Sequence, residues 1–398
     1  MLPRFRYQIK RRLYKYLILS IFALFCLSIV VLYNVVSGPV SWGLMSVGLE
    51  KVLKPQIRST FLFRRTEYED NSSQHELLSY PNIGRTVVGL IGQRRIFRPN
   101  NRTVYELPSD GIPIAGTLFV AHACTHSSLD FWMKTASNID ACSDCIGLAE
   151  ETLIVNKALA SGWVVVAIDS SDRNSGCWRV EDNSFVNSEL SAIRQRLDVS
   201  SHLPLFAIGT SSGGSFVWGM AVKGAVDGLI VQVMSVNVDG TKLPARIPII
   251  LHPMKRDKRT FDAMASNFKH LVALYGSDHV KFEECIPLPV TSEYILGRMP
   301  ELNENIAQRI VDLLKSSGDI SNSSGYLVKD PTDIHNNWRN LLLQNIAAQD
   351  MRNISLQRGK SRLAKVLNRA WAFHEYCADY IEQDLKWMHS MAMQTASV

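Results

Sequence analysis

Short apolar runs alternate with helical patterns through the middle of this chain, and no other feature of the sequence constrains its fold as strongly. Each run has the length of a strand and lacks a polar face, as a parallel strand covered on both sides requires. The runs fall at 116–121, 162–169, 205–209, 229–236 and 247–251, and the helical patterns at 148–160, 186–197 and 213–223. This alternation predicts an α/β fold with a mostly parallel central sheet and helices on both faces.

Further segments flank this region. The segments 86–97 and 103–107 predict an antiparallel pair of strands before it, and 280–286 predicts one more strand after it. Helical patterns at 306–314 and 338–346 then fall within residues 288–368. We expect residues 288–368 to form a helical insertion that caps the site and sets access to it.

Composition and charge narrow the class of protein. The chain has 398 residues, of which 46% are hydrophobic and 20% charged, an ordinary globular composition that excludes a disordered or low-complexity chain. Its net charge is +6, but six of the 43 basic residues lie in residues 1–15, which contain no acidic residue. The remainder carries 37 basic and 37 acidic residues, so the sequence gives no indication of a nucleic-acid partner.

The N-terminus has the pattern of a membrane anchor. Residues 16–36 contain no charge, and a helix of that length spans about 31 Å, enough for a bilayer core of about 30 Å. The basic tail, residues 1–15, predicts a cytosolic N-terminus, so the sequence predicts a single-pass type II membrane protein of the secretory pathway. A cleavable signal peptide is the alternative, but the run is longer than a signal core and Pro39 follows it. Residues 37–80 are expected to form a juxtamembrane linker.

Cysteines and glycosylation motifs fit a lumenal or extracellular domain. Six cysteines outside the apolar span permit up to three disulfides, whose pairing the sequence leaves open. They are Cys124, Cys142, Cys145, Cys177, Cys285 and Cys377. A single C-x-x-C, at 142–145, is weak evidence for zinc, and we predict no metal site. Four N-x-S/T motifs begin at Asn71, Asn101, Asn322 and Asn353.

The strongest chemical motif follows the third buried run. Residues 209–213 read G-T-S-S-G, a G-x-S-x-G pattern placed between a predicted strand and an apolar helix. In this context the serine sits on a sharp turn whose flanking glycines relieve crowding, and the helix N-terminus favours developing negative charge. Ser211 is therefore the predicted nucleophile, rather than part of a Gly/Ser-rich turn without chemistry.

An oxyanion hole requires backbone N–H groups close to the nucleophile. The first predicted donor is the N–H of Ser212, the residue after the nucleophile. The second should come from the loop after the first central strand, where residues 122–124 read H-A-C. Either Ala123 or Cys124 can supply it, and Ala123 stands where a glycine is usual.

Together these motifs make residues 81–390 resemble a serine hydrolase of the α/β-hydrolase superfamily. Within it, H-A-C-T-H at 122–126, D-F-W at 130–132, G-L-A-E-E at 147–151 and C-W at 177–178 resemble uncharacterised eukaryotic members from plants, algae and protists. The resemblance implies a Ser-Asp-His order along the chain, a catalytic serine and no cofactor, and it specifies no substrate.

The acid and the base follow the nucleophile. Asp257, just after the run at 247–251, is the predicted acid, with Asp239 and Asp278 as alternatives. His374 is the predicted base, because the resembling proteins carry a similar His-Glu, and we expect it to open an amphipathic final helix. The competing base is His335, and the other histidines after Asp257 are His270, His279 and His389.

Three functional hypotheses follow. The first is a membrane-anchored serine hydrolase that cleaves a carboxylic ester or related acyl bond of a small-molecule or lipid substrate through an acyl-enzyme. The second is an acyltransferase that uses the same triad, and the third is a non-catalytic binding module that retains the fold. A fluorophosphonate probe separates the first from the third, because a binding module would not be labelled.

Overall fold

The computed structural model describes residues 95–134, 142–238, 243–244, 246–347, 354, 356 and 361–395. The predictions for 1–15, 16–36 and 37–80 fall outside these residues, so the anchor and its orientation stay predictions. Asp239, one alternative acid, also falls outside them. Within the described ranges, no helix is both long and apolar enough to cross a bilayer.

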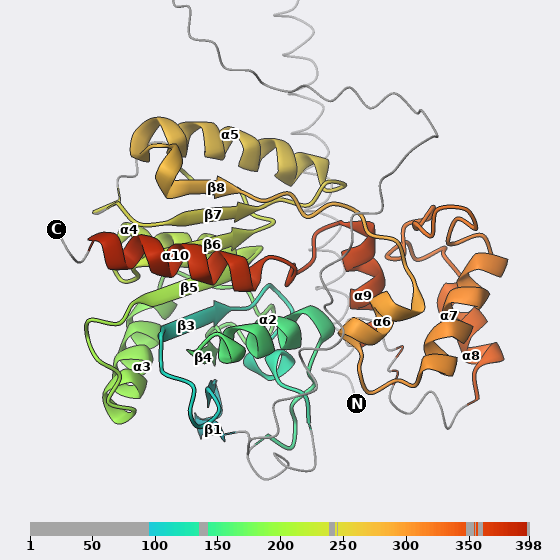
Figure 1. Cartoon of the computed structure of the whole chain (residues 1–398), viewed down its shortest axis with the longest axis horizontal. Helices are drawn as coiled ribbons and strands as arrows, with labels where there is room; N and C mark the ends of the chain where they lie inside the picture. Colours follow the sequence, from blue (N-terminus) through green and yellow to red (C-terminus); the bar gives the residue numbers. More distant parts are fainter. Residues whose placement is uncertain are drawn as a thin grey trace, which may run out of the picture. The chain divides into compact units, whose positions relative to one another are not determined.

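An eight-stranded sheet forms the centre of the fold, with the order β1-β2-β4-β3-β5-β6-β7-β8 (Figure 1). The first two strands pair antiparallel, β2 pairs antiparallel with β4, and the others run parallel. The strands are β1 (Arg95–Asn100), β2 (Thr103–Leu107), β3 (Gly116–Ala121), β4 (Trp163–Ile168), β5 (Leu205–Thr210), β6 (Gly228–Gln232), β7 (Ile249–His252) and β8 (Val280–Phe282). The predicted α/β fold with a mostly parallel sheet is confirmed.

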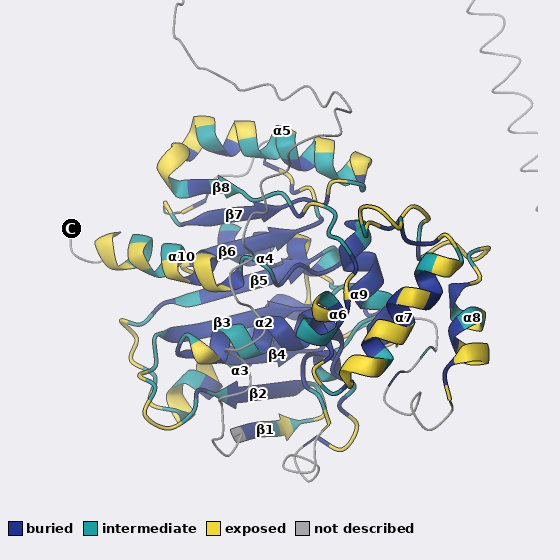
Figure 2. Ribbon diagram, turned by 45° about the vertical axis from the view of Figure 1, so that its right-hand side comes forward, coloured by how far each residue is buried: buried dark blue, intermediate teal, exposed yellow. Residues whose placement is uncertain are grey.

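Helices cover both faces of the sheet, which explains why the central strands are apolar throughout. One face packs against α3 (Asp182–Arg196), α4 (Ser212–Val222) and α5 (Lys258–Tyr275). The other face packs against α2 (Ala149–Ala160) and α10 (Ile381–Thr395). Every residue of β4 is buried, its side chains alternating between the two cores, as a strand covered on both sides requires. Figure 2 shows this burial along the central strands.

A group of helices between β8 and the final helix builds a third core. It comprises α6 (Ser292–Arg298), α7 (Glu304–Ser316), α8 (Trp338–Asn345) and α9 (Arg362–Trp371). Figure 1 shows these helices beside the sheet, past the ends of its strands. In α7, buried apolar residues alternate with exposed polar ones at helical spacing, so one face is buried in this core. The described part of 288–368 thus carries these four helices, most of α9 included.

Several predicted element bounds are wrong, and the backbone gives the reason for two of them. The run at 229–236 extends past the end of β6, because Val233 adopts a positive φ of 43° that a continuing strand does not tolerate. The final helix does not begin at His374 but at Ile381. Positive φ values at Ala372 (59°) and His374 (41°) place His374 in the connection between α9 and α10.

Three disulfides pair the six cysteines. They join Cys124 to Cys177, Cys142 to Cys145, and Cys285 to Cys377.

Candidate active site

Ser211 lies on the turn between β5 and α4 with φ 55° and ψ −120°. This backbone conformation is rare for a residue with a side chain and is found where the surrounding structure enforces it. Close packing explains the two flanking glycines. A Cβ on Gly209 would lie 2.1 Å from the Gly213 carbonyl oxygen, and one on Gly213 would lie 2.2 Å from that of Ala121. The G-x-S-x-G pattern therefore forms the sharp turn that the sequence predicts.

The structure brings Ser211, His374 and Asp257 into one chain of hydrogen bonds. His374 Nε2 lies 3.0 Å from Ser211 Oγ, and His374 Nδ1 lies 2.7 Å from Asp257 Oδ2. A carboxylate can only accept, so Nδ1 carries the ring proton, and Nε2 is left to accept the serine hydroxyl proton. Both distances fall within the range expected for a nucleophile, its base and the orienting acid.

Asp257 is held at the carboxyl end of the sheet. It follows β7 and is the N-cap of α5, where its Oδ1 accepts from the Thr260 N–H at 3.4 Å. The sequence pattern did not predict α5. The cap fixes one carboxylate oxygen, so the other is free to face His374.

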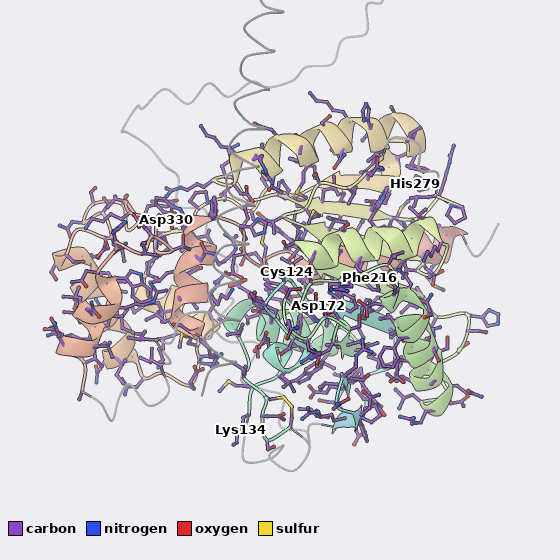
Figure 3. All side chains as sticks on the ribbon, turned by 180° about the vertical axis from the view of Figure 1, so that it is seen from behind. Cys124, Lys134, Asp172, Phe216, His279 and Asp330 are labelled. Atoms are coloured by element: carbon purple, nitrogen blue, oxygen red, sulfur yellow. A yellow bond between two sulfur atoms is a disulfide. The ribbon has the colours of Figure 1, made fainter. Side chains whose placement is uncertain are left out.

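The alternative residues lie elsewhere in the described structure. Asp278 and His279 form the short helix η2 (Ser277–His279), which precedes β8 and therefore sits at the amino end of a parallel strand. In Figure 3, His279 lies toward the opposite side of the molecule from the insertion that carries Asp330. His335 is exposed on a turn of that insertion, where its N–H donates to Asp333.

Residues 372–380, which we call the base loop, are tied to the sheet around His374. Ala372 accepts from the Arg256 N–H at 3.0 Å. Cys377 is bonded to Cys285 beyond β8, and its N–H and carbonyl both pair with the Gln232 side chain at the end of β6. The base loop is thus attached to three neighbouring strand ends, and these attachments fix His374 against Ser211.

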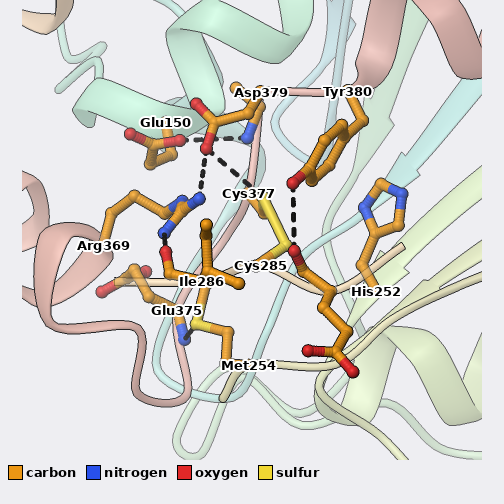
Figure 4. Close-up of polar contacts among 12 residues, drawn as sticks. Glu150, His252, Met254, Cys285, Ile286, Arg369, Glu375, Cys377, Asp379 and Tyr380 are labelled. Atoms are coloured by element: carbon orange, nitrogen blue, oxygen red, sulfur yellow. Dashed lines mark hydrogen bonds and ion pairs between the residues drawn. A yellow bond between two sulfur atoms is a disulfide. The ribbon is translucent and has the colours of Figure 1, made fainter. Parts of the chain in front are cut away.

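A cluster of ions secures the far end of the base loop, and Figure 4 shows Asp379 and Arg369, which form one of its pairs. Asp379 contacts Arg369 of α9 and Arg298 of α6, and Arg298 also pairs with Glu150 of α2 at 2.5 Å. Burial opposes charge on Asp379, but Arg369 and Arg298 hold its pKa below the usual range. The insertion and the base loop are therefore joined by paired charges.

The residues predicted as oxyanion donors lie in the loop after β3 and at the start of α4. Cys124 is tied by its disulfide to Cys177, and the Trp178 indole N–H donates to the His122 carbonyl at 2.7 Å. Within the described part of the chain, the N–H groups of Ser212 and Cys124 have no protein acceptor. Ala123 differs, because its N–H already donates to the Tyr376 hydroxyl at 2.7 Å.

Tyr376 is one site residue that sequence reasoning missed. Its place after His374 suggested the apolar face of a helix, whereas it is a base-loop residue whose hydroxyl meets the loop after β3. The two residues of this contact are 253 positions apart, and no local pattern reports such a pairing.

A cavity of about 280 Å³ opens over the serine. Its lining includes the serine, the histidine and both loops described above. The lining residues are Ala123, Cys124, Thr125, His126, Thr210, Ser211, Lys365, His374, Glu375 and Tyr376. Cys124, labelled in Figure 3, marks its position in the fold.

A buried polar group forms one wall of this cavity. Lys365 Nζ lies 3.1 Å from Glu375 Oε2 and 3.1 Å from His126 Nε2. On its other side His126 faces Glu151, with Nδ1 3.0 Å from Oε1. Burial, followed by the Lys365 charge, lowers the pKa of His126 to about 4. Burial and the neighbouring Glu375 raise the pKa of Glu151 to about 8, so Glu151 is protonated at neutral pH.

Glu151 should make stability depend on pH. The pKa of this carboxyl is near 4.5 in the unfolded chain and about 8 in the folded chain. Between these values the folded chain binds more protons, so the free energy of unfolding falls as pH rises. In thermal melts from pH 5 to 8, Glu151→Gln should reduce this decline relative to wild type. Glu181→Gln, which alters an exposed carboxyl, is the control, and parallel curves for wild type and Glu151→Gln would contradict the assignment.

One other group of side chains has the composition of a metal site. Donor atoms of His252, Cys285 and Cys377 lie within 4.8 Å of one another. Its members already have partners, because the two cysteines form a disulfide and the His252 ring faces Gln232 and Asp384. These residues fit a structural role better than a metal centre.

Comparison with known proteins yields distantly similar solved structures only. No protein-family model and no curated protein matches the chain. Similar solved structures include a carboxylesterase from Bacillus cereus, at 15% identity over 46% of this chain and 83% of that one, with a TM-score of 0.33. A carboxylesterase from Mesorhizobium loti matches at 13% identity over 48% and 89%, with a TM-score of 0.31. A serine hydrolase without a lid from Xanthomonas campestris matches at 12% identity over 48% and 83%, with a TM-score of 0.32. These three solved structures are similar to the chain over about half of its length.

Proposed function

We propose that this protein is a serine hydrolase that cleaves carboxylic esters through an acyl-enzyme. The observation that carries the proposal is the hydrogen-bonded chain from Ser211 through His374 to Asp257, at 3.0 and 2.7 Å, on a strand–turn–helix serine. Three residues from separate parts of the sequence meet there in the order and geometry of a nucleophile, a base and an orienting acid.

In the proposed reaction, His374 Nε2 takes the hydroxyl proton as Ser211 Oγ attacks the ester carbonyl carbon. Asp257 stabilises the imidazolium that forms, and the N–H groups of Ser212 and Cys124 donate to the oxyanion. Collapse of this intermediate expels the alcohol, which takes the proton from His374. Water then attacks the acyl-serine with His374 again as base, and the carboxylic acid leaves.

A covalent probe and a simple ester test this proposal. The full-length protein should be labelled by a fluorophosphonate and should hydrolyse p-nitrophenyl acetate. A folded protein that shows neither reaction would be a binding module, and the proposal would fail. An acyltransferase would still be labelled, but an added alcohol would accept the acyl group faster than water does.

The cavity favours short acyl groups. Its volume of about 280 Å³ lies below the roughly 300–1,000 Å³ of pockets for drug-sized ligands. One wall carries Lys365 and Glu375, and an alkyl chain laid against them would desolvate charge without compensating hydrogen bonds. We expect kcat/KM for p-nitrophenyl acetate and butyrate to exceed that for the palmitate by about tenfold or more.

The rate of ester hydrolysis with Ser211→Ala is subtracted from the wild-type rate to correct for spontaneous hydrolysis of short esters. This variant retains the cavity but lacks the nucleophile. A higher kcat/KM for the palmitate would contradict the inference on acyl size while leaving the serine chemistry intact.

A further inference from the structure

The Tyr376 hydroxyl has a proton with no acceptor in the described protein. A tyrosine hydroxyl donates one hydrogen bond and accepts up to two. One acceptor position is filled by the Ala123 N–H at 2.7 Å. The Glu151 carboxyl group is close enough to affect the titration of the tyrosine, yet neither of its oxygens receives a hydrogen bond. Tyr376 is only 2% exposed, so bulk water does not take the proton either.

The remaining place for this proton is the cavity over the serine. Tyr376 lines it together with Ser211 and Cys124. Ala123 lies in the loop from which the second oxyanion donor is expected. The Tyr376 hydroxyl, which accepts a hydrogen bond from the Ala123 N–H, should therefore lie next to the place where the oxyanion forms. We propose that Tyr376 Oη–H donates to the oxyanion of the tetrahedral intermediate, taking the part that the Ala123 amide would otherwise play. This inference rests on the proposed ester hydrolysis.

The hydroxyl is suited to this role in its protonation and its position. Burial raises the pKa of Tyr376 well above its ordinary value, so the hydroxyl keeps its proton over the working range of an esterase. Accepting from the Ala123 N–H polarises the O–H bond and makes it a stronger donor. A donor held before the reaction does not need to reorganise when the negative charge appears.

Neighbours on each side of Tyr376 hold the ring in place. Its ring packs edge-on against Phe131, with centroids 5.9 Å apart, and lies 5.4 Å from the His126 ring. The preceding Glu375 pairs with Lys365, and the following Cys377 is bonded to Cys285. The base loop thus presents the base and, two residues later, the additional donor.

Removing the hydroxyl distinguishes this role from a structural one. Tyr376→Phe should lower kcat for p-nitrophenyl acetate by about a hundredfold, the usual effect of losing one oxyanion donor, with little change in KM. If the Tyr376 hydroxyl served only to accept the hydrogen bond of the Ala123 N–H, the same variant would leave that N–H able to donate to the oxyanion. In that case kcat would stay level or rise. Tyr294→Phe is the matched control, because its hydroxyl donates to the Val366 carbonyl and Tyr294 belongs neither to the cavity lining nor to the base loop.

A transition-state analogue gives a second measurement. A trifluoromethyl ketone forms a tetrahedral adduct with the serine and carries an oxyanion, so Tyr376→Phe should weaken its inhibition by about tenfold or more. Unchanged inhibition in a variant that melts like wild type would overturn the proposal. Wild-type protein that neither labels nor hydrolyses would instead refute the proposed function.

If Tyr376→Phe does not fold, the chain with 3-fluorotyrosine at position 376 keeps the ring and both hydrogen bonds. Fluorination acidifies the hydroxyl and should change kcat severalfold. An unchanged kcat would overturn the proposal.

Discussion

Replacing Ser211 with alanine should abolish fluorophosphonate labelling and reduce ester hydrolysis a thousandfold or more, to about the background rate. His374→Ala should cost a similar factor, because the hydroxyl 3.0 Å from Nε2 is a weak nucleophile without its base. The double variant should be no slower than either single one, because the two groups act as a unit. Asp257→Asn should cost less than Ser211→Ala if other polar groups still orient the ring. Rates are measured with p-nitrophenyl acetate at saturating concentration.

His335→Ala is the matched control for the base. This histidine is exposed on the insertion and bonds only locally, so its loss should leave turnover within about twofold. Near-normal turnover in His374→Ala combined with an inactive His335→Ala would reassign the base. Labelling retained in Ser211→Ala would refute the serine-hydrolase proposal altogether.

Asp379→Asn should destabilise the fold by about 3 kcal/mol. The carboxylate neutralises Arg369 and Arg298, whose side chains are 1% and 8% exposed, and its loss leaves two buried cations with one fewer partner. The free energy of unfolding is measured by urea denaturation with intact disulfides. We also expect lower activity below the melting range, because the base loop loses an attachment.

Asp144→Asn provides the comparison for Asp379. It removes an ion pair of the same kind, to Arg98, with the aspartate 52% exposed, and should cost less than about 1 kcal/mol. Equal losses in the two variants would show that burial of the arginines is not what makes the Asp379 pairs important.

The strands and the serine turn could be predicted because their causes are local. A strand buried on both faces must be apolar throughout, and β3 and β4 lie within one residue of the predicted runs. The turn at Ser211 needs glycine where a Cβ would strike backbone, as Gly209 and Gly213 show. Such steric requirements are written into a few neighbouring residues.

What the sequence could not show depends on contacts between distant segments. The helix α5 was missed, as its buried residues are few and charged side chains dominate its start. The sequence around His374 follows a helix and has a helical pattern. The disulfide between Cys377 and Cys285 and the hydrogen bond from Gln232 to Cys377 hold these residues in a loop instead. The pairing of Tyr376 with Ala123 depends on two loops meeting across the sheet edge.

The bond between Cys285 and Cys377 has a consequence for how this architecture can diversify. The two cysteines are 92 positions apart and stand where the helical insertion leaves the sheet and where it returns. The disulfide holds the two ends of the intervening chain together, so the middle of that chain can lengthen or shorten without moving either end. The closure entropy of a flexible segment grows by only about 0.6 kcal/mol for each doubling of length. The outer helices α7 and α8 can therefore be exchanged as a module, because the base loop and the two arginines that pair with Asp379 lie outside them.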